Sequence, residues 1–193
     1  MSFEAFIRDY AGKRYEYVNG QALPMGPEII GVDGEVSVTP TKSGHGLVIG
    51  RLSVIIGAYV LKNDLGEIFG AETGFHLKKD PPLMRAADIA FVSRERLKGA
   101  DLSDWMPIPD LAVEVVSEYD RAREVHQKVQ HYLTAGIRLV WIVYPDERQI
   151  VVHAPDADAK TLSANDTLNG GAVLPEFAVT IGEIFAGLDA LEK

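Results

Sequence analysis

The strongest constraint on the fold is a buried strand that is followed by an amphipathic helix and a second strand. Residues 111–116 form an apolar run with one acid, Glu114, which predicts a strand buried on both faces. A helix is predicted over residues 121–135, and residues 138–144 are strand-like. These three elements make a βαβ unit, so the two strands should be parallel neighbours joined by a right-handed crossover.

Other segments add a long helix and several short strands around this unit. Apolar residues at three- and four-residue spacing predict a core-facing helix over residues 43–65. Residues 67–77 and 87–93 are predicted to be strands, separated by Asp80-Pro81-Pro82, a break that cannot lie inside a strand. The remaining expected elements are a strand over residues 149–153 and, after short edge pieces, a helix over residues 181–186. The expected fold class is α/β of the mixed α+β kind, a central mixed β-sheet flanked by helices.

The composition is that of an ordinary folded chain. The 193 residues are 47% hydrophobic and 24% charged, and we expect one domain over residues 1–193. Charged residues from the fourth position onward exclude the apolar core of a secretory signal. The sequence lacks an apolar run of about 18 residues, the length of a transmembrane helix. Because it also lacks cysteine, it has neither disulfides nor thiolate zinc sites, and we expect a cytoplasmic protein with no membrane partner.

The net charge limits the kinds of partner. A formal charge of −9 weighs against broad, non-specific binding to polyphosphate, which depends on many Lys and Arg contacts. It does not exclude an enzyme that acts on nucleic acid, because a metal site made of carboxylates is itself acidic. The glycines fit neither a P-loop nor a dinucleotide fingerprint, which speaks against nucleotide cofactors.

Two acids in apolar strands are the strongest candidates for chemistry. Glu114 lies among residues that favour burial, where an isolated ionised carboxylate is too costly to be incidental. The alternative is a buried ion pair or a protonated glutamate. Asp88 begins the apolar run ADIAFVS, although an aspartate at a strand start is also commonly a solvated end or a turn cap. Two carboxylates on adjacent strands would form an oxygen-rich pocket suited to Mg²⁺.

Lys128 lies on the predicted helix that follows the Glu114 strand. Its spacing from Glu124 favours an exposed i, i+4 ion pair worth a few tenths of a kcal/mol. It also shares a helical stripe with Val125 and Tyr132, which points it partly toward the sheet. A lysine there could orient a water or stabilise charge on phosphorus.

The order of these residues resembles a known family. Asp88, then Glu114 in PDLAVEVVS, then EVHQKVQHYLTAGIRLVWIVYPDERQIVVH, is similar to the Uma-type family of putative restriction endonucleases, a branch of the PD-(D/E)XK nuclease superfamily. RYEYVNGQALPM near the start, GHGLVIGRL on the long helix and DTLNGGAVLPEFAVTIGEIF at the end extend the resemblance over nearly the whole chain. No single motif is diagnostic, so the resemblance rests on order and spacing together.

The resemblance implies a restriction-endonuclease-like core that hydrolyses phosphodiester bonds in DNA with Mg²⁺ or Mn²⁺. Asp88 and Glu114 would be the metal ligands. The superfamily's lysine normally lies two residues after the glutamate, where this chain has Val116. In Uma-like sequences a lysine from the following helix replaces it, which is Lys128 here. A second departure is Ala87, where the family usually has the proline of its PD dipeptide.

Four further residues are candidates, three of them through the resemblance and Ser117 from the sequence itself. Glu16 is similar to an N-terminal acid that often approaches the metal site in this superfamily, and the alternative is a surface charge on a strand. His45 matches a family histidine with a general-base or substrate-contact role, although a polar group at a helix N-terminus is the simpler account. Glu124 stands where many relatives have aspartate, and Ser117 is interpreted as a cap or an outer donor to the site.

Two classes of function therefore stay open. The first is a metal-dependent endonuclease that acts on DNA, with a homodimer expected because two-fold symmetry is the commonest oligomeric arrangement. The alternative is a catalytically silent nuclease-fold module that binds or regulates, which the acidic charge and Ala87 favour. Trp105 is expected to pack in the core or in a loop, although an exposed Trp105 beside the site could stack on a base.

Overall fold

A six-stranded mixed sheet forms the centre of the computed structural model, which describes residues 1–32, 34–40, 42–101 and 105–191. Its strands are Gly66–Gly70 (β5), Ile89–Ser93 (β8), Leu111–Val115 (β9), Leu139–Tyr144 (β10), Gln149–His153 (β11) and Lys160–Leu162 (β12). They lie in the order β12-β11-β10-β9-β8-β5. β9 and β10 run parallel, and the other neighbours pair antiparallel.

The predicted βαβ unit is confirmed. β9 lies in parallel register with β10, Leu111 beside Leu139, and α4 (Ala122–Ala135) connects the two strands. The helix ends where Gly136 adopts a left-handed backbone conformation with φ of 95°, which residues other than glycine rarely adopt. All five residues of β9 are buried, as expected for a strand covered on both faces.

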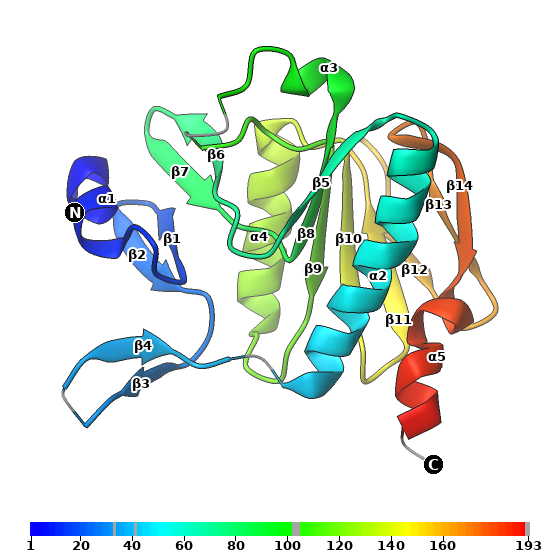
Figure 1. Cartoon of the computed structure of the whole chain (residues 1–193), viewed down its shortest axis with the longest axis horizontal. Coiled ribbons are helices and arrows are strands. Elements are labelled where there is room, and N and C mark those ends of the chain that lie inside the picture. The colour runs from blue at the N-terminus through cyan, green and yellow to red at the C-terminus, as the bar shows by residue number, and fades with distance from the viewer. Residues whose placement is uncertain (33, 41, 102–104, 192–193) are drawn as a thin grey trace.

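Helices cover both faces of the central sheet (Figure 1). α2 (Ser43–Lys62) and α5 (Ile181–Leu191) pack on the face that carries Val113, whereas α4 packs on the face that carries Ala112. This arrangement confirms the predicted fold class. Because side chains alternate along a strand, Glu114 belongs to the α4 face.

A second, four-stranded sheet corrects two of the strand predictions. Its strands are Tyr15–Val18 (β1), Gln21–Pro24 (β2), Phe75–Lys79 (β6) and Pro82–Arg85 (β7), in the order β2-β1-β7-β6. The single strand predicted over residues 67–77 is wrong, because β5 and β6 belong to different sheets. β7 begins at Pro82, inside the expected break; the first residue of a strand tolerates the missing N–H of proline.

The termini and connections complete the fold. α1 (Phe3–Tyr10) packs on the second sheet through Phe6, and α3 (Arg94–Leu97) follows β8. The C-terminal hairpin of β13 (Thr167–Gly170) and β14 (Leu174–Thr180) leads into α5, which continues past the expected end at residue 186. The helix predicted over residues 43–65 ends earlier, at Lys62, because the chain turns at Asp64 with φ of 54°.

α2 also passes a simple test for a membrane-spanning segment. Among the described helices it alone is long and apolar enough to cross a membrane by length and composition. A core helix of a soluble protein can meet the same two criteria. In this fold Val48, Leu52, Ile56 and Val60 are buried in the main core.

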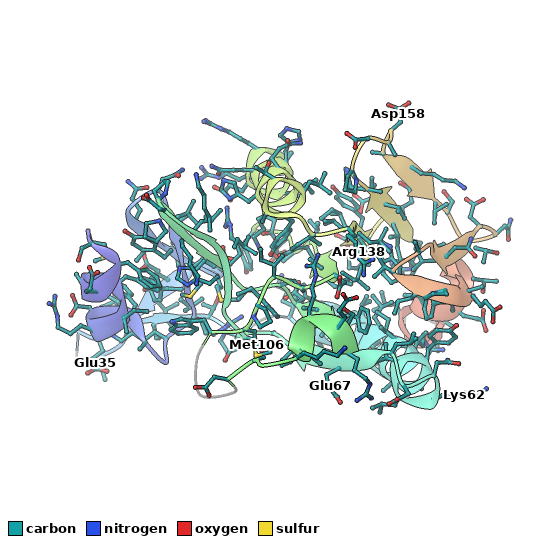
Figure 2. All side chains as sticks on the ribbon, turned by 90° about the horizontal axis from the view of Figure 1, so that it is seen from above. Glu35, Lys62, Glu67, Met106, Arg138 and Asp158 are labelled. Atoms are coloured by element: carbon teal, nitrogen blue, oxygen red, sulfur yellow. The ribbon has the colours of Figure 1, made fainter. Side chains whose placement is uncertain are left out.

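A two-stranded arm projects beside the N-terminal helix (Figure 1). It consists of β3 (Glu28–Ile30) and β4 (Val36–Val38), and its base leads directly into α2. Figure 2 places Glu35, in the arm, and Lys62, at the end of α2, at opposite sides of the molecule. The base of the arm lies near the first turn of α2, since Thr39 and His45 line the same cavity.

Candidate active site

A cavity of about 320 Å³ lies at the end of the sheet where β9 and β10 finish. Four segments form its walls: the base of the arm, the first turn of α2, the loop after β9 and the turn after β10. Its lining includes Asp88, His45, Glu114, Ser117, Tyr119 and Lys128. The crevice outside the carboxyl ends of the strands is where open α/β sheets usually bind ligands.

Glu114 lies at the floor of this cavity and is held by two residues of α4. Lys128 Nζ donates to Glu114 Oε2 at 2.7 Å, and the hydroxyl of the fully buried Tyr132 donates to Oε1. Lys128 and Tyr132 are four residues apart, so both reach the sheet from one helical face. Sequence reasoning placed Tyr132 on the apolar stripe and missed this contact.

Asp88 faces the same cavity from the neighbouring strand. β8 and β9 are antiparallel with Ile89 beside Val113, so the same register puts Asp88 opposite Glu114. Side chains of opposite residues share one face of a sheet. Asp88 Oδ2 also accepts a hydrogen bond from the Val115 N–H at 2.8 Å, which fixes the carboxylate against the end of β9. Asp88, directly before β8, and Glu114, in β9, therefore line one cavity.

The partner of Lys128 differs from the one that spacing alone favours. The ammonium pairs with Glu114 and lies in the cavity, whereas Glu124 is exposed on the first turn of α4 and does not line the cavity. The expected exposed Glu124–Lys128 pair is wrong because the long lysine stem follows the apolar stripe to a carboxylate that would otherwise be buried unpaired.

Burial controls the electrostatics of the two carboxylates. It raises the pKa of Glu114 to about 7, with Lys128 opposing the change and Asp88 reinforcing it. Burial likewise raises the pKa of Asp88 to about 6, against the hydrogen bond from Val115. Burial would lower the pKa of Lys128, but attraction to Glu114 and Glu16 outweighs it and holds that pKa above its ordinary value. The lysine therefore stays charged beside two acids that ionise reluctantly.

These raised pKa values predict how the metal-free protein responds to pH. An acid whose pKa is higher in the folded state than in the unfolded state stabilises the fold at pH values below its unfolded-state pKa. This contribution to the free energy of unfolding is lost as the pH rises through the folded-state pKa. One pKa unit corresponds to about 1.4 kcal/mol, so between about pH 5 and about pH 8 the parent should lose up to a few kcal/mol relative to Glu114→Gln. Urea unfolding in EDTA measures this difference, and parallel stability profiles would contradict it.

His45 ties α2 to the end of β9. It lies within the first turn of α2, and its Nε2 is 2.7 Å from the carbonyl oxygen of Val115. Burial lowers the pKa of His45, so the neutral ring donates from Nε2 to that carbonyl and Nδ1 becomes the acceptor. Nδ1 is buried without a hydrogen-bond partner among the described residues. These contacts agree with a polar anchor at the helix start.

Glu16 lies beside the site rather than in it. It is buried in β1, where Arg85 Nη1 donates to Oε2 and the Ala86 N–H donates to Oε1 at 3.0 Å. The surface strand charge that was its alternative is wrong, because the side chain is buried and paired. Glu16 lines a neighbouring cavity with Trp105, and neither residue lines the cavity of Asp88. Trp105 is thus not placed to stack on a base there.

The loop after β9 is closed by a local turn. Ser117 donates from its N–H and its hydroxyl to Asp120 Oδ2 at 2.8 and 2.7 Å, as a turn cap would. Val116, at the position of the superfamily's usual lysine, lines the cavity with an apolar side chain. Lys128 thus supplies the ammonium group that the strand lacks.

The charged residues of the cavity do not form a complete metal cage by themselves. Within the described ranges, no group of three His, Asp or Glu side chains could hold a metal ion. Mg²⁺ often takes one or two carboxylates and completes its coordination with waters and substrate phosphate. The pair of Asp88 and Glu114 fits that pattern.

Comparisons with known proteins identify the family. A family model, Uma2, described as "Putative restriction endonuclease", matches residues 2–182. The fold is similar to a crystal structure from Anabaena variabilis described as a putative nuclease belonging to DUF820, with a TM-score of 0.79 and 16% identity over 97% of this chain and 99% of that chain. No curated protein matches the chain. The structural likeness shows the fold alone, but the family match covers nearly the whole sequence. The chain therefore belongs to the Uma2 family of putative restriction endonucleases.

Proposed function

We propose that this protein is a metal-dependent nuclease that hydrolyses phosphodiester bonds in DNA. The observation that carries the proposal is a pair of carboxylates, the half-buried Asp88 and the buried Glu114, which share a cavity with the ammonium of Lys128. Family membership supports nuclease chemistry in general. Magnesium dependence and DNA as the substrate are part of the proposal, as is a homodimer.

The donor set suits Mg²⁺ or Mn²⁺ held by Asp88 and Glu114. Both hard cations prefer oxygen ligands, and the two carboxylates line the same cavity. Both oxygens of Glu114 already accept hydrogen bonds, from Lys128 and Tyr132. Each carboxylate oxygen can accept more than one contact, so these bonds orient Glu114 without using all of its capacity. When bound, the ion would supply Lewis-acid polarisation of the phosphate and an acidified water.

The protein groups have separate tasks in this proposal. Lys128 stabilises negative charge on the phosphate or positions the attacking water, because its ammonium is fixed 2.7 Å from Glu114 at the cavity floor. Tyr132 orients Glu114 through the hydrogen bond from its hydroxyl to Oε1. The Val115 N–H holds Asp88, and His45 donates to the carbonyl of the same residue, with its Nε2 3.8 Å from Asp88 Oδ2.

The first test combines metal binding with cleavage. With Mg²⁺ or Mn²⁺ the purified protein should cleave DNA, and calorimetric titration with Mn²⁺ should show binding that Asp88→Ala loses. Asp88→Ala should also lose cleavage by at least about a hundredfold, in line with losing a metal ligand or its support. Intact single-stranded and duplex DNA in both metals would refute the proposal.

A catalytically silent module remains the rival function. The observation that favours it is that each oxygen of Glu114 already has a donor, Lys128 or Tyr132, which is enough for a purely structural buried acid. A structural pair predicts no heat from Mn²⁺ titration in the parent protein. Metal binding that depends on Asp88 would exclude this explanation of the pair.

A further inference from the structure

An exposed aromatic ring stands on the wall of the active-site cavity. Tyr119 lies in the loop between β9 and α4, lines the cavity, and is 55% exposed. The ammonium of Lys42 is 6.0 Å from its ring centroid and pairs with Glu118, which steadies the loop from the α2 side. Sequence reasoning considered Trp105 for stacking, but Tyr119 is the aromatic side chain that faces this cavity.

The shape of the cavity restricts which nucleic acid can reach its floor. The side chains of Glu114, Asp88 and Lys128 are only 9%, 17% and 22% exposed, beneath walls formed by four chain segments. A volume of about 320 Å³ is at the small end of pockets that hold small molecules. Duplex DNA is stiff over many base pairs, so its strands cannot bend into such a pocket, whereas an unpaired strand can.

The charges of the cavity wall also favour an unpaired strand over a duplex. Duplex binding depends on many Lys and Arg contacts to phosphates. The basic side chains that line the described wall are each paired with an acid: Arg14 with Glu72, Lys42 with Glu118, Lys128 with Glu114 and Arg148 with Asp189. This wall therefore offers little positive charge to the phosphates of a long duplex. Stacking of an unpaired base on an aromatic ring does not require such contacts.

We propose that the cavity takes an unpaired nucleotide, with its base stacked on Tyr119 and its neighbouring phosphate directed toward Asp88 and Glu114. This substrate class, an unpaired stretch of DNA, rests on the proposed nuclease function and makes it more specific. The ring supplies a face that any base can use, so the subsite selects unpaired structure rather than sequence.

The test compares strands and variants in one cleavage assay. Short oligothymidylate, the same strand paired with oligodeoxyadenylate, and the same strand with one abasic position are incubated with the parent protein and Mn²⁺. The unpaired strand should have at least about tenfold higher kcat/KM than the duplex. Tyr119→Ala should lower kcat/KM on the unpaired strand by about tenfold or more, the usual size of one base–aromatic stack. Tyr119→Phe should behave like the parent, because it keeps the ring.

The abasic strand tests stacking itself. It should be cleaved less well than the complete strand by the parent when the missing base lies at the cleaved position, and Tyr119→Ala should remove that difference. Val54→Ala, on the exposed outer face of α2, serves as a control and should match the parent on every strand. Equal or better cleavage of the duplex, or an unchanged rate for Tyr119→Ala, overturns this inference and leaves the nuclease proposal standing.

Failure of the nuclease proposal gives a different pattern. If the parent cleaves none of the strands, fluorescence anisotropy with the labelled oligothymidylate still decides the subsite. Binding that weakens about tenfold in Tyr119→Ala and persists in Tyr119→Phe supports it without turnover. Absence of binding, or equal binding by Tyr119→Ala, overturns it.

Discussion

Lys128→Met should lower kcat for the proposed DNA cleavage by at least about a hundredfold, the loss expected when one preorganised charge-stabilising group is removed from an active site. The physical reason is that the ammonium lies 2.7 Å from Glu114 at the cavity floor, and Val116 leaves the strand without a lysine. Methionine keeps the length and apolar stem of the side chain and removes only the charge. Single-turnover cleavage of a labelled strand with saturating Mn²⁺ measures the change.

Two further variants make the Lys128 result interpretable. Gln130→Ala changes an exposed position on the same helix and should leave kcat unchanged. The double variant Glu114→Gln with Lys128→Met should be no slower than the slower single variant, because residues that act as a unit are not additive. Circular dichroism checks that each variant is folded. A folded Lys128→Met that cleaves within tenfold of the parent would remove the lysine from the mechanism.

The centre of the fold was predictable from sequence because its signals are local. The apolar run around Glu114, the periodic helix after it and the next apolar run are each readable alone, and the rules for βαβ units join them. Glu114 was conspicuous for the same reason, since a single acid in a buried strand needs a compensating partner. Lys128 was harder, because helical spacing offered two partners and only packing chose Glu114.

Other features depend on contacts between distant segments and left no local signal. The chain from β5 to β6 looks like one strand, yet sheet pairing assigns its two halves to different partners. Tyr132 looked like an ordinary core residue, and the sequence around it does not predict its hydrogen bond to Glu114. The partner of Glu16 lies 69 positions away, at Arg85. Such pairings are set by tertiary structure, which overrides local preference.

The buried pair of Glu16 and Arg85 joins the second sheet to the active site. Both side chains are at least 95% buried, and they face each other across the antiparallel strands β1 and β7. Arg85 also donates to His131 Nδ1 on α4, at 3.3 Å from Nε and 3.1 Å from Nη2. The chain continues from Arg85 through Ala86 to Asp88, so the pair also fixes the approach to the proposed metal ligand.

Arg85→Met should therefore destabilise the fold by about 3–5 kcal/mol, the usual cost of leaving a buried charge without its partner. The double variant Arg85→Met with Glu16→Gln should recover most of that loss, because a neutral amide no longer needs a cation beside it. The midpoint of urea unfolding at constant m-value measures both effects. A loss below about 1 kcal/mol, or a double variant as unstable as the single one, would show that Glu16 does not depend on Arg85 as a partner. In the expected case Glu16 has a structural role: it helps to raise the pKa of Glu114 and of Lys128, and Arg85 holds its carboxylate away from the proposed metal site.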